Sequence, residues 1–280
     1  MKILFATDFS DASNHAFRYC LGFAEFLSAD IQVLHVYRPL NVRGHHSPNL
    51  MEDMLKDHDL DLLEEFRAGT AGLRSMISEA GLESMPVTFV LEKGDAVDII
   101  CRQAASLDAG LVVLGTKGAG FVKEIFMGSV AAEVLEQAPC PVLVVPEAAV
   151  FDGRIDTMAV TTDYTGEDAA AVRLAADWAN RLQAHLHCVH VDSTHTEEIS
   201  HEMDRFRKYF EGSRQITFHV LDEFDMQKAL VAFAVDRQVD LLVMVAHQRN
   251  FFRELFRYSH AKSMSYHRNI PLLVFHPSDL

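Results

Sequence analysis

Short runs of apolar and β-branched residues alternate along the chain with longer stretches in which apolar residues recur every three or four positions. The short runs are typical of strands that are buried on both faces of a parallel sheet. The longer stretches predict amphipathic helices. These helices are expected over residues 13–27, 95–106, 130–137, 167–182, 225–237 and 260–267. Strands that alternate with helices indicate an α/β fold.

The strand-like runs occur twice in the same order. The run that ends at Asp8 reappears ending at Asp163, and the run that ends at Val36 reappears ending at Val191. Two later runs, 111–115 and 141–145, correspond to runs 242–246 and 271–275. Four blocks in one order indicate an internal duplication, in which the second repeat lacks roughly 25 residues opposite the stretch 39–85.

The duplication predicts two homologous doubly wound domains, residues 1–148 and 149–280. Each is expected to hold a five-stranded, mostly parallel sheet flanked by helices in a Rossmann-like arrangement. Residues 146–156 are the expected linker. Residues 42–73 form an insert of the first repeat that is predicted to begin as a loop and continue as a helix.

Composition and charge narrow the class of protein. The chain of 280 residues is 49% hydrophobic and 23% charged, which is typical of a globular protein. No apolar run approaches the ~20 residues that a membrane-spanning helix needs, and Asp8 comes too early for a signal-peptide core. The four cysteines are scattered, which favours reduced thiols and a cytoplasmic location. The net charge of −15 repels nucleic acid and anionic membranes, so neither is an expected partner.

A glycine-rich stretch follows the fourth strand-like run of the first repeat, at the end of the sheet where α/β proteins bind ligands. It contains Gly115 and Gly118 and closes with Gly128 and Ser129, directly before a helical stretch. Glycines allow close backbone approach and positive φ, and free N–H groups at a helix start can hold phosphate oxygens. Asp8 could accept a hydrogen bond from a ribose hydroxyl or an amino group. By itself, the pattern also fits plain turn chemistry and a helix cap.

The spacing Gly-x-x-Gly, nine residues, then Gly-Ser resembles the nucleotide-binding signature of the universal stress protein family. Gly115, Gly118, Gly128 and Ser129 supply it here. The opening Ala-Thr-Asp-Phe-Ser at residues 6–10, the strand end Leu-His-Val at 34–36 and the closing run 139–145 look like that family as well. The resemblance is close in the first half and looser in the second, so the whole chain is similar to a tandem universal stress protein.

The resemblance implies a nucleotide site with adenine and ribose contacts at the strand ends and phosphate contacts at the glycine loop. The implied residues are Thr7, Asp8 and Val36 for adenine and ribose, and Gly115, Gly118, Gly128, Ser129 and the Val130 backbone for phosphate. ATP is the implied ligand, and in the family a divalent ion such as Mg²⁺ often bridges the phosphates. The sequence shows no dedicated cage for that ion.

The second repeat departs from the loop pattern. Its equivalent positions hold Ala246, Arg249, Ser259 and His260, whose side chains would crowd the approach that bare glycines allow. Asp163 is retained, but half of the site is missing. We expect nucleotide binding to be lost in the second domain.

The last strand of each repeat, 142–145 and 272–275, is an apolar run after a proline and is expected at a sheet edge. An apolar edge invites aggregation unless it is covered. In single-domain members of the family that the chain resembles, this strand is where two subunits meet. The sequence therefore predicts an intramolecular pseudo-dimer through these strands, and a further homodimer of whole chains stays open.

Catalytic chemistry is less visible than binding chemistry. The sequence holds no P-loop, no G-x-G-x-x-G and no G-x-S-x-G elbow, and no catalytic base is identified beside the glycine loop. His185 and His187 lie on one face of a strand, but no Cys or carboxylate completes a metal set, so no metal site is predicted. Three hypotheses remain: a nucleotide-binding regulator with at most slow ATPase activity, an ATP-hydrolysing or phosphotransfer enzyme, and an interaction scaffold with an empty pocket.

Overall fold

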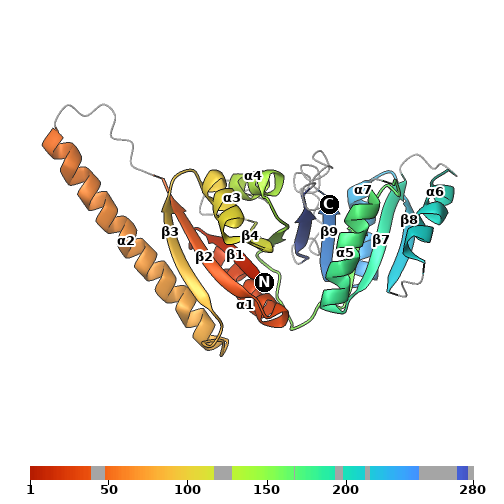
Figure 1. Ribbon diagram of the computed structural model, residues 1–280, viewed down its shortest axis with the longest axis horizontal. Helices are drawn as coiled ribbons and strands as arrows, with labels where there is room; N and C mark the ends of the chain where they lie inside the picture. The colour runs from red at the N-terminus through yellow and green to blue at the C-terminus, as the bar shows by residue number, and fades with distance from the viewer. Residues whose placement is uncertain are drawn as a thin grey trace.

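The computed structural model describes residues 1–38, 48–116, 128–166, 168–192, 198–211, 215–245 and 270–276. The first half contains β1 (Lys2–Thr7), α1 (Asp11–Leu27), β2 (Asp30–Tyr37), α2 (Pro48–Glu79), β3 (Val87–Lys93), α3 (Ala96–Leu107), β4 (Leu111–Gly115), α4 (Ser129–Gln137) and β5 (Val142–Val145). The second half contains β6 (Thr157–Thr161), α5 (Asp168–Leu182), β7 (His185–Asp192), α6 (Glu198–Arg207), the 3₁₀ helix η1 (Lys208–Phe210), β8 (Ile216–Asp222), α7 (Met226–Asp236), β9 (Leu241–Val245) and β10 (Leu272–Phe275). The two halves lie side by side, joined through their sheets (Figure 1).

The ten strands form one sheet in the order β3-β2-β1-β4-β5-β10-β9-β6-β7-β8. Within each half all neighbouring strands are parallel, whereas β5 and β10 pair in antiparallel register, with Leu273 opposite Leu143. The predicted α/β class and the predicted pairing of the last strands are confirmed. Because β10 runs against β5, the carboxyl ends of the strands lie at opposite edges of the sheet in the two halves.

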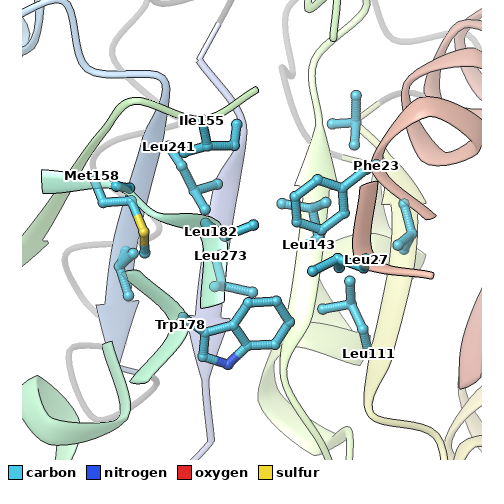
Figure 2. Packing of buried hydrophobic residues seen from close by; sticks show 14 of the residues in the cluster. Phe23, Leu27, Leu111, Leu143, Ile155, Met158, Trp178, Leu182, Leu241 and Leu273 are labelled. Carbon is cyan, nitrogen blue, oxygen red and sulfur yellow. The ribbon is translucent and has the colours of Figure 1, made fainter. Parts of the chain in front are cut away.

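Apolar side chains cover both faces of the sheet in two layers that run across both halves. One layer is covered by α1, α2, α5 and α6, and the other by α3, α4 and α7. Leu143 of β5 and Leu273 of β10 lie in the first layer with Leu27 and Trp178 (Figure 2). Alternate side chains of each central strand enter opposite layers, as the pleat requires. The two repeats therefore share their cores instead of folding around separate ones.

The helix predictions hold wherever the structure describes the chain. α1 begins after Ser10, whose hydroxyl accepts a hydrogen bond from the Ser13 N–H at 3.2 Å, and ends at Ser28 in the left-handed conformation. α3, α4, α5 and α7 begin and end within one residue of the predicted bounds. α2 is longer than predicted, since it continues to Glu79, and its first turns extend beyond the sheet (Figure 1). The predicted helix 260–267 lies outside the described residues.

The linker is anchored to both halves. The ring of Phe151 packs into a notch on α1, where a Cβ on Gly22 would lie 2.7 Å from Phe151 Cδ1. At the other end of the linker, the Asp240 carboxylate accepts hydrogen bonds from the N–H groups of Asp156 and Thr157 at 2.8 and 2.9 Å. His276 then donates from Nε2 to the carbonyl of Glu136, at the end of α4, at 2.8 Å. These contacts fix the second half against the first.

Within the described residues, no helix has both the length and the apolar character needed to cross a membrane.

Candidate functional site

β1 ends in a hydrogen-bonded turn at the carboxyl edge of the sheet. Phe9 adopts the left-handed conformation, with φ of 58°, and its N–H donates to Thr7 Oγ1 at 2.9 Å. The Ser13 hydroxyl donates to the same oxygen at 2.8 Å. The Asp8 carboxylate accepts hydrogen bonds from the Ser10 N–H at 3.1 Å and from the Ser10 hydroxyl at 2.6 Å. Thr7 and Asp8, both predicted site residues, are thus held in place by the chain itself.

The adjacent strand β2 supports this turn. His35 donates from Nδ1 to the Thr7 carbonyl at 2.8 Å, and its ring stacks on Phe9 with centroids 4.6 Å apart. Because a carbonyl can only accept, the hydrogen must sit on Nδ1. α2 approaches Phe9 closely at Gly69, where a Cβ would lie 2.5 Å from the Phe9 ring. Val36, the predicted adenine neighbour, is half-buried beside His35.

Gly115 ends β4 where α1 crosses it. A Cβ on Gly115 would lie 3.2 Å from the carbonyl oxygen of Ala12 and 3.5 Å from the Cβ of Ala16. Gly115 does not use the positive φ that a glycine allows. The role that the geometry shows for Gly115 is therefore close packing of α1 against β4.

Valine in place of Gly115 is expected to lower the free energy of unfolding by about 1–3 kcal/mol, because α1 must move to admit the side chain. Urea denaturation measures this, with Gly72→Val as the control, since nothing lies within 4 Å of a Cβ at Gly72. An unchanged stability of Gly115→Val together with a loss of nucleotide binding would show that Gly115 acts on the ligand and not on packing.

Thr116 closes the glycine loop. Its N–H donates to the Val145 carbonyl at 3.2 Å, and its own carbonyl accepts a hydrogen bond from the Gly128 N–H at 2.6 Å. The hydrogen bond between Gly128 and Thr116 fixes the start of α4 beside the end of β4. Thr116 was not among the predicted residues, since only the fold reveals this contact. Gly118 lies outside the described residues.

The amino terminus of α4 is open. Gly128 is the N-cap residue, with φ of −64°, and no side-chain hydrogen bond caps the helix in the described part of the chain. In contrast, Ser10 caps α1 and Asp95 caps α3. Ser129 is exposed in the first turn, and Val130 is half-buried against the core. The first N–H groups of α4 are thus directed to whatever acceptor lies at this edge.

The sheet topology brings these residues together. The chain leaves β1 for β2 and β3 on one side and returns to β4 on the other, so β1 and β4 flank the point where the strand order reverses. Ligands of doubly wound proteins bind at this switch point. Thr7, Asp8, Gly115 and the start of α4 all lie there, with Val36 on the adjacent strand.

Comparison with known proteins assigns the fold and the repeat. A sequence profile of the Universal stress protein family matches residues 1–146 and again residues 154–276. The chain belongs to the universal stress protein family. A universal stress protein of Thermus aquaticus is 33% identical over 143 residues, which are 51% of this chain and 96% of that protein. One of Methanocaldococcus jannaschii is 28% identical over 147 residues, 51% of this chain and 81% of that protein.

A solved universal stress protein of Archaeoglobus fulgidus spans the whole chain. It aligns with a TM-score of 0.66 at 18% identity and covers 98% of this chain and 96% of its own. At that identity the likeness concerns the fold alone. Together with the two profile matches, it establishes two universal stress protein domains in tandem.

The second universal stress protein domain repeats the strand-end turn. Tyr164 is left-handed with φ of 56°, and its N–H donates to Thr162 Oγ1 at 3.0 Å. His190 donates from Nδ1 to the Thr162 carbonyl at 3.0 Å. These are the counterparts of Phe9, Thr7 and His35. The duplication therefore preserved the backbone of the turn as well as the strands.

The charge of the repeated turn differs between the domains, because Asp11, Ala12 and Ser13 correspond to Gly166, Glu167 and Asp168. Where the first domain has Ser13, the second has Asp168, whose Oδ2 accepts hydrogen bonds from the Asp163 N–H at 2.9 Å and from the Thr165 N–H and hydroxyl at 3.2 and 3.0 Å. The Thr162 hydroxyl donates to it at 3.2 Å. An added carboxylate at this edge disfavours polyanions. The loop positions Ala246, Arg249, Ser259 and His260 lie outside the described residues.

The titratable groups of the described residues form no metal site. No group of three His, Cys, Asp or Glu side chains in the described ranges has an arrangement that could hold a metal ion. Burial raises the pKa of the Cys20 and Cys188 thiols, which keeps them protonated and unreactive.

Proposed function

We propose that the first domain binds ATP at the carboxyl edge of β1, β2 and β4 and that the chain is a nucleotide-dependent regulator in the stress response. The observation that carries the proposal is the start of α4, which no side chain of the described residues caps and which the hydrogen bond from Gly128 to Thr116 holds beside the end of β4. Free N–H groups and the positive end of a helix dipole favour phosphate. The glycine loop that resembles the family signature ends at this same helix start.

The residues at this edge fit the parts of the nucleotide. The Asp8 carboxylate would accept a hydrogen bond from a ribose hydroxyl or an adenine amine, and Val36 would supply apolar contact to the base. The N–H groups of Ser129 and Val130 would donate to phosphate oxygens. The N–H of Gly128 is already bonded to the Thr116 carbonyl, so Gly128 would contribute by letting a phosphate approach the backbone closely. A divalent ion would be held by the phosphates, since the described residues offer no cluster of ligating side chains.

The proposal gives the two domains, residues 1–148 and 149–280, different roles. The first binds the nucleotide, and the second is its structural or regulatory partner. The scattered positions of the four cysteines fit a reducing compartment, so we place the protein in the cytoplasm as part of the proposal.

Calorimetric titration is expected to give one ATP per chain, because Asp168 and the substituted loop positions oppose binding in the second domain. Asp8→Asn should weaken binding about 10- to 100-fold, the usual loss when a charged acceptor is removed. Asp163→Asn, the same change in the second repeat, should leave the affinity unchanged. Two equivalent sites per chain, or equal effects of the two variants, would contradict the assignment.

Turnover and co-purification distinguish the alternatives. We expect bound ATP to be recovered intact from the freshly purified protein. Sustained phosphate release that Asp8→Asn abolishes would favour an ATP-hydrolysing enzyme. A chain that carries no nucleotide and gives no heat with ATP would favour the interaction scaffold.

A further inference from the structure

Three imidazoles of the second domain converge on one hydroxyl, far along the chain from the proposed nucleotide site. Thr217 Oγ1 lies 3.0 Å from His185 Nε2, 2.6 Å from His187 Nδ1 and 3.1 Å from His219 Nε2. His187 Nδ1 and His219 Nε2 are themselves 3.0 Å apart. Strands β7 and β8 bring these side chains together, since His187 and Thr217 are paired in the sheet register. We refer to His185, His187 and His219 as the histidine cluster.

α7 covers the histidine cluster. The Phe233 ring meets the His187 and His219 rings edge-on, with centroids 5.5 and 5.0 Å apart. The Arg237 guanidinium lies over the Phe233 ring, 5.9 Å from its centroid, and pairs with Asp236 at 3.3 Å. On the side of β6 the register neighbour of His187 is Ala159, which brings no charge. His187 is only 8% exposed, so water reaches it poorly.

The hydrogen-bond count of the cluster excludes a charge on both His187 and His219. At 3.0 Å, one of the two nitrogens of His187 and His219 must offer a lone pair to the other. A proton on both would set two N–H groups against each other. The Thr217 hydroxyl has a single hydrogen, so it cannot satisfy three acceptors and must accept from at least one ring. The network is complete when the rings are neutral, and the contact between His187 and His219 is lost when both rings are protonated.

Burial and the charged groups around the cluster also favour its neutral state. Burial first, and then His185, His219 and Arg237, lower the pKa of His187 to about 4. Burial, Arg237 and His185 also lower the pKa of His219. Among the described residues that face the two rings, Arg237 of α7 carries a permanent charge. Its positive charge opposes the protonation of either ring.

We propose that the histidine cluster is an acid-sensitive latch, which holds α7 on β7 and β8 while its rings are neutral and releases α7 as they gain protons. The released state would expose Phe233 and the inward faces of both strands. The latch belongs to the second domain, and it operates whether or not the first domain binds ATP. It gives the domain with the altered nucleotide loop a sensing role of its own.

The sign of the effect follows from the lowered pKa. In an open state the rings titrate near 6.5, whereas His187 in the closed state titrates near 4. The closed state therefore binds fewer protons between these values, and its stability is full above about pH 6.5 and falls as the pH drops toward 4. For His187 alone, the equilibrium constant for opening should rise about 30-fold between pH 7.5 and pH 5.0.

Hydrogen exchange of the α7 amides, corrected for the intrinsic pH dependence of exchange, tests the latch in the full-length chain. Protection should fall about 30-fold from pH 7.5 to pH 5.0, while α3, the corresponding helix of the first domain, keeps its protection. In the double variant His187→Asn with His219→Gln, whose amides can hydrogen-bond but do not titrate, the change should be less than about threefold.

His190→Asn is the matched control. His190 lies on the same strand, and although burial opposes it, hydrogen bonds to Asp163 and to the Thr162 carbonyl raise its pKa. Its loss should leave the acid response of α7 in place. Protection of α7 that is independent of pH, or an acid response that persists in the double variant, would overturn the proposal.

Direct titration of the imidazole Cε1–H signals by NMR keeps the proposal testable if the double variant does not fold. His187 should stay neutral to below pH 5, whereas the His190 signal should shift at a higher pH than an ordinary histidine. Titration of His187 near pH 6.5 in the folded chain would also overturn the latch.

Discussion

Residues 1–148 expressed alone are expected to dimerise or aggregate. In the full chain, β5 pairs with β10, and every side chain of β5 is buried. Removal of the second half would expose the free edge of β5 and uncover neighbouring parts of both apolar layers. Each large side chain that is exposed in this way loses about 1.5–3 kcal/mol of burial free energy. An unpaired apolar strand edge also templates the association of further chains.

Sedimentation velocity at high protein concentration measures this outcome, with the full-length chain as the control. Far-UV circular dichroism shows whether the fragment keeps its α/β content while it associates. A dimer would mean that a second β5 replaces β10. A folded fragment that stays monomeric would contradict the conclusion that the two halves protect each other's edges.

Aspartate in place of Ser129 is expected to weaken ATP binding strongly and yet to stabilise the protein. Ser129 is exposed at the open start of α4. A carboxylate there interacts favourably with the helix dipole and adds about 0.3–1 kcal/mol to the free energy of unfolding. The same charge repels a phosphate at 4–8 Å by about 2–4 kcal/mol at an effective dielectric near 20, a loss of roughly 30- to 1000-fold in affinity.

The opposite signs make this variant informative. Thermal melting without ligand should show the stabilisation, and calorimetry should show the loss of binding. Ser129→Asn introduces a side chain of nearly the same shape as aspartate but without its charge, and it should retain binding within about tenfold. If Ser129→Asp binds ATP as the parent does, phosphate does not lie at the start of α4.

Local sequence signals determined the elements and the class of fold. The assigned runs match β1, β2, β4 to β7, β9 and β10, because strands buried on both faces must be apolar throughout. No run was assigned to β3 or β8, which are only partly buried. Helix bounds were predicted closely where a cap residue marks them, as Asp95 does for α3. α2 was predicted less well, since most of its described length is exposed and the sequence reading did not use the end signal at Gly81, which is left-handed with φ of 70°.

The candidate site was partly readable from the sequence. The residues Thr7, Asp8, Gly128 and Ser129 were found because a spacing pattern and the ends of strands point to them. Thr116 was missed, since its role depends on a hydrogen bond to Gly128 across the glycine loop. Gly115 was read as a ligand contact, whereas its close neighbours in the structure are Ala12 and Ala16 of α1. Its contact to a nucleotide stays a prediction.

The sequence by itself thus determined that this chain is a duplicated α/β protein with one well-formed glycine signature, because repeats, periodicity and caps are local properties. Only the tertiary structure decided how the repeats face each other. The antiparallel pairing of β5 with β10 sends the two carboxyl edges to opposite sides of one sheet. The tertiary structure also decided that His187 meets His219, since this contact joins side chains whose distance is set by strand register and not by spacing along the chain.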